Sequence, residues 1–157
     1  MPGTTETPSP HARMDDDQAG LHFVRSLFDE TIERPPMARI LPFELLAPEL
    51  GKVMLVATPE PSFANTLQTV HGGWAMTMLD TSMNLAAHTT LKGRELAPTL
   101  ETSVKFVRPI SVDAGPLHVS GTVISRTRTV ITLEGSITSR EGKLFAHGTS
   151  TCMVVQA

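Results

Sequence analysis

The sequence contains a single cysteine, Cys152, among 157 residues. One thiol cannot form a disulfide within the chain, which excludes the small disulfide-stabilised folds that are typical of secreted proteins. Cys152 lies in a segment of strand character with no base positioned beside it, so we expect an inert, partly buried thiol. The cysteine content favours a reducing compartment, and we expect a cytoplasmic protein.

Concentrated positive charge is also missing. The chain has 13 basic and 16 acidic residues, which give a net charge of −3, and the basic residues form no long run. Because nucleic acids and anionic membranes attract concentrated basic patches, we expect neither as a partner. No run of about 18 apolar residues is present to span a bilayer, and residues 1–20 lack the apolar segment of a signal peptide.

The histidines show no metal-ligand spacing. None of the six pairs with another as H-x-x-x-H. Two lie in or near the N-terminal tail, one near the end of a predicted helix and two on predicted strand surfaces or an interface: His11, His22, His88, His118 and His147. We expect no metal site and no cofactor.

The N-terminal residues differ in composition from the rest of the chain. Residues 1–20 are rich in Pro, Thr, Gly and Asp and have almost nothing to bury, which predicts a mobile tail. Residues 21–157 are long enough for a single domain with its own core. In residues 21–33 the apolar side chains follow helical spacing, and Pro35 and Pro36 are expected to stop that helix.

Most of the remaining chain has strand character. Residues 40–46 and 52–58 are short apolar segments separated by Pro48 and Gly51, and they predict a hairpin. Apolar and polar residues then alternate from 100 to 106, which predicts a strand half covered by a core. Three β-rich runs follow, near residues 116–126, 129–139 and 143–155. We expect these four strands to form an antiparallel meander, with Gly142 supplying positive φ in the last turn.

Between the hairpin and the strands, residues 74–90 predict one long helix, closed on its C-terminal side by Gly93. The helix contains no Lys, Arg or Glu, although these residues normally cover the wet face of a surface helix. We therefore expect it to be buried, with a curved antiparallel sheet wrapped around it. The fold class is α+β.

A polar stripe nevertheless follows this helix. Its members recur at i, i+3 and i+4 and share one face: Thr77, Asp80, Thr81, Asn84 and His88. One interpretation is the solvent face of an ordinary amphipathic helix. The absence of long charged side chains favours the other, in which the stripe faces a second subunit or a narrow cleft.

The start of the helix has chemistry of its own. The first backbone N–H groups of a helix have no internal partner and favour negative charge. Because Gly72 and Gly73 lack side chains, a substrate oxygen could approach these amides closely. The alternative is a glycine turn that merely lets a strand enter a helix.

The distance between the glycines and the carboxylate restricts how they could cooperate. Asp80 lies seven residues beyond Gly73, about 10 Å along the axis, and its side chain recovers only about 2 to 3 Å of this. One chain therefore cannot easily place both groups on one reacting atom. If both act together, a second copy of the helix must lie antiparallel to the first, which predicts a two-fold dimer with two sites.

The segment NTLQTVHGGWAMTMLD contains Asn65, His71 and Asp80 at spacings of six and nine residues. It resembles the signature of hotdog-fold acyl-CoA thioesterases, specifically the phenylacetate-degradation (PaaI-like) branch, over residues 39–155. The resemblance implies a hotdog fold, an antiparallel β-sheet wrapped around one long central helix. It also implies a hydrolase that is a homodimer or a homotetramer made from two dimers.

The resemblance implies roles for individual residues. The Gly72 amide, helped by Gly73, would polarise the thioester carbonyl, and Asp80 of the other subunit would be the nucleophile or the base that activates water. Asn65 and His71 would hold the thioester and the attacking group. Thr99, at the start of the strand after the helix, would hydrogen-bond near the attacking water.

The resemblance further implies a site for CoA. Its phosphates and pantetheine would contact residues of the segment SRTRT together with an aromatic side chain: Ser125, Arg126, Arg128, Thr129 and Phe106. Without the resemblance, residues 125–129 would be interpreted as a solvated hairpin end.

Two rival functions remain. A hotdog dehydratase or hydratase acting on acyl thioesters would carry a different local motif, and no D-x-N-P-x-H element occurs here. A non-catalytic acyl-CoA binding module would need the fold without the carboxylate, and the presence of Asn65 and Asp80 disfavours it. Aryl, short-chain and medium-chain acyl groups are all compatible with the sequence.

Overall fold

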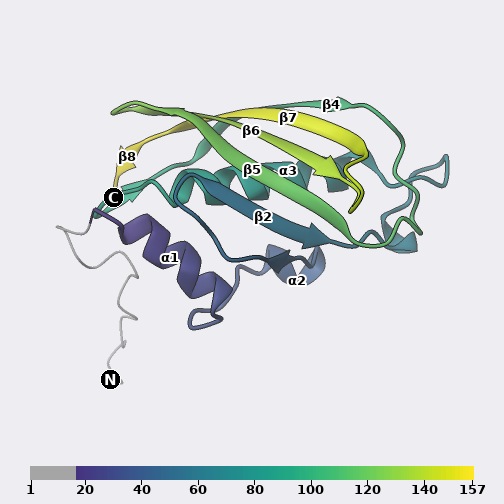
Figure 1. Ribbon diagram of the computed structural model, residues 1–157, viewed down its shortest axis with the longest axis horizontal. Helices are drawn as coiled ribbons and strands as arrows, with labels where there is room; N and C mark the ends of the chain where they lie inside the picture. Colours follow the sequence, from purple (N-terminus) through teal and green to yellow (C-terminus); the bar gives the residue numbers. More distant parts are fainter. Residues whose placement is uncertain (1–16) are drawn as a thin grey trace, which may run out of the picture.

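The computed structural model describes residues 17–157, in which an antiparallel sheet curves around one long helix (Figure 1). The helices are α1 (Ala19–Phe28), α2 (Met37–Ile40) and α3 (Gly72–His88), with a 3₁₀ turn at Pro61–Phe63. The strands are β1 (Glu44–Leu45), β2 (Lys52–Ala57), β3 (Glu95–Leu96), β4 (Thr99–Phe106), β5 (Leu117–Arg126), β6 (Val130–Thr138), β7 (Leu144–Met153) and β8 (Val155–Gln156). The predicted α+β hotdog fold is confirmed.

The order of strands corrects one prediction. The main sheet runs β1-β2-β5-β6-β7-β4, and each neighbouring pair is antiparallel. β5, β6 and β7 form the expected meander, but β4 does not pair with β5. It crosses to the far side of the sheet and pairs with β7, while β2 takes the place beside β5. Sequence periodicity identifies strands but carries no information on which strands pair.

The elements before α3 are shorter than predicted. α1 ends at Phe28, well before the two prolines, and residues 37–40 form a helical turn where the first hairpin strand was expected to begin. The hairpin itself is confirmed, because Glu44 and Leu45 pair with Val56 and Leu55. Of the expected tail, residues 1–16 lie outside the described part of the chain, whereas Ala19 and Gly20 begin α1 and are buried, so the boundary at residue 20 was wrong.

The predicted long helix is confirmed over Gly72–His88, and it packs on the sheet through Trp74, Ala75, Leu79, Met83 and Ala86, all buried. Three glycines lie in register beneath it, with Gly121 of β5 paired to Gly135 of β6 and Gly135 paired to Gly148 of β7. A Cβ atom at Gly121 would lie 2.2 Å from the carbonyl oxygen of Ser82 in α3. Glycine is therefore required where the helix backbone touches the sheet.

Gly142 has a φ of +85°, as the predicted tight turn requires. The short pair β3 and β8 was not predicted, because two-residue strands are too short to show a period. Within residues 17–157, no helix is both long enough and apolar enough to cross a membrane.

We expect Gly121→Ala to destabilise the fold by about 3 kcal/mol, because the new methyl group must displace the backbone of α3. Gly148→Ala is the matched control. There the nearest atoms to an added Cβ are the Ser103 carbonyl oxygen at 3.3 Å and flexible side-chain carbons at 3.4 and 3.5 Å. Urea unfolding of both variants measures the difference, and equal losses would show that helix contact does not distinguish the two glycines.

Candidate active site

The polar stripe of α3 is neither open to solvent nor fully enclosed. All five of its residues are partly buried in the single chain: Thr77, Asp80, Thr81, Asn84 and His88. α1 covers the C-terminal end of the stripe, where the rings of Phe23 and His88 lie 6.0 Å apart. This arrangement does not match the ordinary solvent face that was the first interpretation.

The Asp80 carboxylate points toward β4. Its Oδ1 accepts a hydrogen bond from the Thr102 hydroxyl at 3.0 Å. The Thr102 hydroxyl lies 3.2 Å from the Ser150 hydroxyl, which donates to the Glu101 carbonyl oxygen at 2.9 Å. These contacts hold the carboxylate in one orientation.

Thr102 was not predicted as a site residue. The sequence nevertheless contains a signal for it, since Thr102 is a polar side chain on the face of the strand that otherwise carries Leu100, Val104 and Phe106. The strand is less regular than predicted, because a register shift between Thr99 and Glu101 interrupts the alternation at Leu100, and Leu100 is 59% and Phe106 57% exposed. β4 is an edge strand in the single chain, and these side chains extend beyond the covered core.

Thr99 lies further along the helix, beside Asn84. The Asn84 amide donates to the Ala97 carbonyl oxygen at 2.8 Å and to the Thr99 hydroxyl at 3.3 Å. It also lies 3.8 Å from the sulfur of Cys152. Within one chain, Thr102 and not Thr99 is the strand residue that contacts Asp80.

Cys152 is fully buried behind this contact. Burial raises the pKa of the Cys152 thiol above its ordinary value, while hydrogen bonds from Thr99 and Asn84 act in the opposite direction. A buried, protonated thiol is a poor nucleophile, which agrees with the expected inert cysteine. Within residues 17–157, no group of three or more His, Cys, Asp or Glu side chains converges as a metal site would require.

At the other end of α3, His71 caps the helix. Its Nδ1 accepts a hydrogen bond from the Gly73 amide at 2.9 Å, so the Gly73 N–H is already used. The Gly72 amide donates no hydrogen bond within residues 17–157. The ring of Phe106 packs over Gly72, where an added Cβ would lie 3.0 Å from its Cζ. Of the two glycine amides, the one at Gly72 is available to a ligand.

Asn65 shapes the loop that leads into the helix. Its Oδ1 accepts from the amides of Leu67 and Thr69, at 2.9 and 3.1 Å, and its amide group donates to the Thr69 hydroxyl at 2.9 Å. Asn65, Gly72 and Phe106 line one cleft of about 300 Å³. The structure thus brings together three of the predicted site residues at the start of α3.

Asp80 belongs to a separate group of residues. Gly72 and Asp80 are eight residues apart on one helix, about 12 Å along its axis. β4 runs beside α3 in the opposite direction, so Phe106 lies against Gly72, Thr102 against Asp80 and Thr99 against Asn84. Within one chain the Gly72 amide and the Asp80 carboxylate do not meet. This separation is what the sequence spacing predicts.

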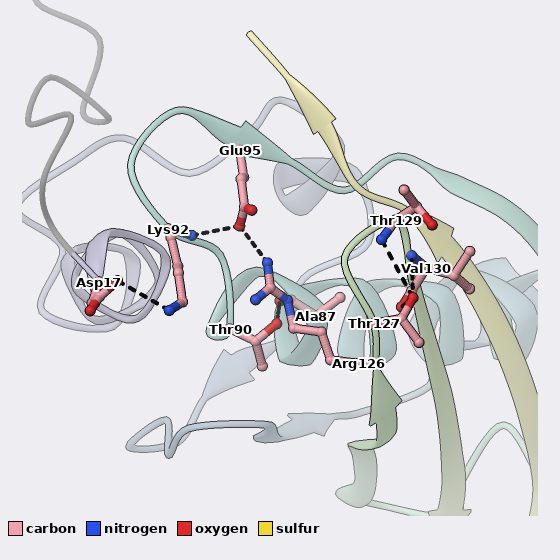
Figure 2. A network of polar contacts seen from close by, with 9 residues as sticks. All are labelled: Asp17, Ala87, Thr90, Lys92, Glu95, Arg126, Thr127, Thr129 and Val130. Carbon is pink, nitrogen blue, oxygen red and sulfur yellow. Dashed lines mark hydrogen bonds and ion pairs between the residues drawn. The ribbon is translucent and has the colours of Figure 1, made fainter.

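The residues of the segment 125–129 that are predicted to bind CoA lie at the far end of the sheet from Gly72. Arg126 forms an ion pair with Glu95 (Figure 2). The Glu95 carboxylate also accepts a hydrogen bond from the backbone amide of Lys92 at 2.9 Å. The Nε of Arg126 is buried without a partner in the described chain. Ser125, Arg128 and Thr129 are exposed in the β5–β6 hairpin.

Phe106 is distant from this hairpin in one chain. Arg126 is in register with Ile131, Ile131 with Cys152, and Cys152 with Thr99, at the start of β4. A register shift between Thr99 and Glu101 adds one residue to β4, and Phe106 pairs with Ala146, six residues from Cys152 on β7. Phe106 is therefore about 20 Å from Thr99 at 3.3 Å per residue. A ligand contacting both Phe106 and Arg126 must therefore be long or use two chains.

Comparison with known proteins assigns the chain to a family. A family model described as Thioesterase superfamily matches residues 67–146, just over half of the chain, including His71, Gly72 and Asp80. A solved phenylacetic acid degradation-related protein from Ralstonia eutropha JMP134 is 26% identical, with a TM-score of 0.76, over 83% of this chain and 98% of that one. No curated protein matches the chain significantly.

Two further solved structures share the fold. The PaaI protein of E. coli is 16% identical with a TM-score of 0.77, over 90% of this chain and 97% of that one. The smu.793 protein of Streptococcus mutans UA159, solved bound to acetyl-CoA, is 23% identical with a TM-score of 0.66, over 73% of this chain and 89% of that one.

Proposed function

The chain belongs to the thioesterase superfamily, and from this premise we propose that it hydrolyses an acyl-CoA thioester to the free acid and CoA. The observation that carries the proposal is the pair of groups on α3: the available Gly72 amide at its first turn and the oriented Asp80 carboxylate two turns later. The acetyl-CoA bound to the Streptococcus mutans protein supports the choice of thioester.

The active site forms between two chains in this proposal. Within residues 17–157, β4 leaves one backbone edge unpaired, and Leu100 and Phe106 are more than half exposed along it. Unpaired edges of this kind readily add a further strand. Antiparallel pairing of two β4 edges would place the two α3 helices side by side in opposite directions, with Gly72 of each facing Asp80 of the other. Two such dimers would make the expected tetramer.

The chemistry follows from these groups. The Gly72 N–H donates to the thioester oxygen as it becomes an oxyanion, and such a donor typically contributes about 2.7 to 4 kcal/mol. In one route Asp80 accepts the proton of a water that attacks the carbonyl carbon; the carbon–sulfur bond then breaks, and the CoA sulfur leaves and takes up that proton. In the other route Asp80 itself attacks the carbonyl carbon and the carbon–sulfur bond breaks, which gives an acyl–Asp80 anhydride and the CoA thiolate. Water then hydrolyses the anhydride to the free acid and regenerates the Asp80 carboxylate, and the proton released goes to the CoA sulfur.

The supporting residues have indirect roles. Thr102 orients the carboxylate, His71 fixes the first turn of the helix through Gly73, and Asn65 fixes the loop before it. Thr99 and Asn84, which lie one helical turn beyond Asp80, would hydrogen-bond to the attacking water. In this proposal CoA extends from Phe106 of one chain toward Arg126 and Arg128 of the other.

We expect Asp80→Asn to lower kcat by about 10² to 10⁴-fold, because the amide can neither attack nor accept the proton. Calorimetry with a non-hydrolysable CoA thioether should show that binding is retained. Asp113→Asn, on an exposed loop, is the control and should keep full activity. A wild-type protein that binds the thioether but hydrolyses no acyl-CoA would identify a binding module, and hydration of an enoyl-CoA would identify a hydratase.

We expect Thr102→Val to lower kcat by about 10 to 100-fold with KM nearly unchanged, since a hydrogen bond to a charged group is worth about 1.5 to 3 kcal/mol. Thr149→Val makes the same change at an exposed position of β7 and should have no effect. Steady-state kinetics on both variants measure kcat and KM. Equal kcat values for the two variants would mean that the Asp80 orientation does not depend on Thr102.

Pairing two inactive variants tests whether the site uses two chains. Gly72→Pro removes the amide N–H at a helix position that favours proline, and Gly72→Ala retains the N–H as its control. A heterodimer of Gly72→Pro with Asp80→Ala, isolated through two different tags, contains one intact pair of groups. We expect about half of the wild-type activity per dimer. An inactive, correctly assembled heterodimer would show that both groups act within one chain.

A further inference from the structure

A second cavity lies on the other side of the polar stripe. It has a volume of about 80 Å³ and is enclosed by the segment between α1 and β1 on one side and by α3 on the other. In Figure 1, α1 and α2 lie at the side of the molecule opposite β4. The main apolar walls are Leu27, Leu41, Phe43, Leu45, Met78 and Leu85.

The cavity borders the proposed site. Thr77 and Thr81, which flank Asp80 in the sequence of α3, are both among its lining residues. Asp80 faces β4, whereas the cavity lies on the adjacent side of the helix, away from the CoA-binding hairpin. An acyl group attached to a carbonyl at Asp80 can therefore enter the cavity while CoA extends toward Arg126.

The lining offers little to a charged or hydroxylated group. The Thr77 hydroxyl donates to the Gly73 carbonyl oxygen at 2.9 Å. The Arg34 guanidinium donates to the Phe43 carbonyl oxygen at 2.7 Å, lies 3.5 Å from Glu30 and lies 5.8 Å from the centre of the Phe43 ring. Its charge is thus already satisfied, and the remaining surface is almost entirely apolar.

The volume limits the size of the occupant. An apolar cavity that accepts benzene measures about 150 Å³, roughly twice the volume here. At about 25 Å³ for each of the six carbons of benzene in that cavity, the cavity described here holds about three carbons. A chain of three carbons beyond the carbonyl fits, and a phenyl ring does not.

We infer that this cavity binds the alkyl chain of a short, unsubstituted acyl group of about four carbons, and that it excludes aryl and carboxylated acyl groups. The inference rests on the proposed hydrolysis. Its walls from residues 27–45 lie outside residues 67–146, the segment that matches the family model.

A panel of thioesters tests the inference: acetyl-, butanoyl-, octanoyl-, phenylacetyl- and succinyl-CoA, with release of free thiol as the signal. We expect the highest kcat/KM for butanoyl-CoA, about tenfold above octanoyl- and phenylacetyl-CoA, since each misfitted methylene typically changes selectivity by about 10 to 200-fold. A preference for phenylacetyl- or succinyl-CoA would overturn the inference and leave the hydrolase intact. Hydrolysis of none of the five would overturn the proposed function itself.

Two variants with opposite effects locate the selectivity. Ala38→Leu fills the cavity and should lower kcat/KM for butanoyl-CoA about tenfold with acetyl-CoA unchanged, whereas Ala47→Leu, at an exposed position, should change neither. Leu41→Ala enlarges the cavity and should raise kcat/KM for octanoyl-CoA. Circular dichroism verifies that each variant is folded. A folded Ala38→Leu variant that affects all esters equally would show that the acyl chain binds elsewhere.

Discussion

The contact between the backbone of α3 and the glycine row of β5, β6 and β7 determines the rest of the structure. With no side chain at Gly121, the carbonyl of Ser82 rests almost directly on the sheet. This contact fixes both the height of the helix and its rotation about its own axis. As a result the apolar face of α3 is buried against the middle of the sheet, and the face that carries Asp80 is directed toward the edge strand β4.

The site then follows from two elements running in opposite directions. Eight residues of helix from Gly72 to Asp80 advance about 12 Å, and four residues of strand from Phe106 to Thr102 advance about 13 Å. Because these lengths match, each candidate position on the helix has a partner on β4. In the proposed mechanism the helix supplies the reacting groups, and the strand covers or orients them.

Sequence patterns predicted the features that depend on neighbours in the chain. The long helix, the strands β5 to β7 and the turn at Gly142 were all evident from local periodicity or a local glycine. Three other features join residues that lie 22 or more positions apart: the pairing of β4 with β7, the contact of Thr102 with Asp80, and the ion pair of Arg126 with Glu95. No local pattern specifies such contacts. The hydrogen bonds of Asn65 and His71 are different, because they reach only two to four residues along the chain. They were not predicted because the resemblance assigns both side chains to the substrate.

The ion pair at the end of the sheet changes how an anion would be captured there. Glu95 already neutralises Arg126, so an incoming phosphate must displace a carboxylate and does not meet a bare cation. Binding becomes an exchange of one counter-charge for another, with a smaller electrostatic gain than two unpaired arginines would give. Such an exchange would make attachment weak and readily reversed, which would suit the release of a large polyanionic product in the proposed reaction.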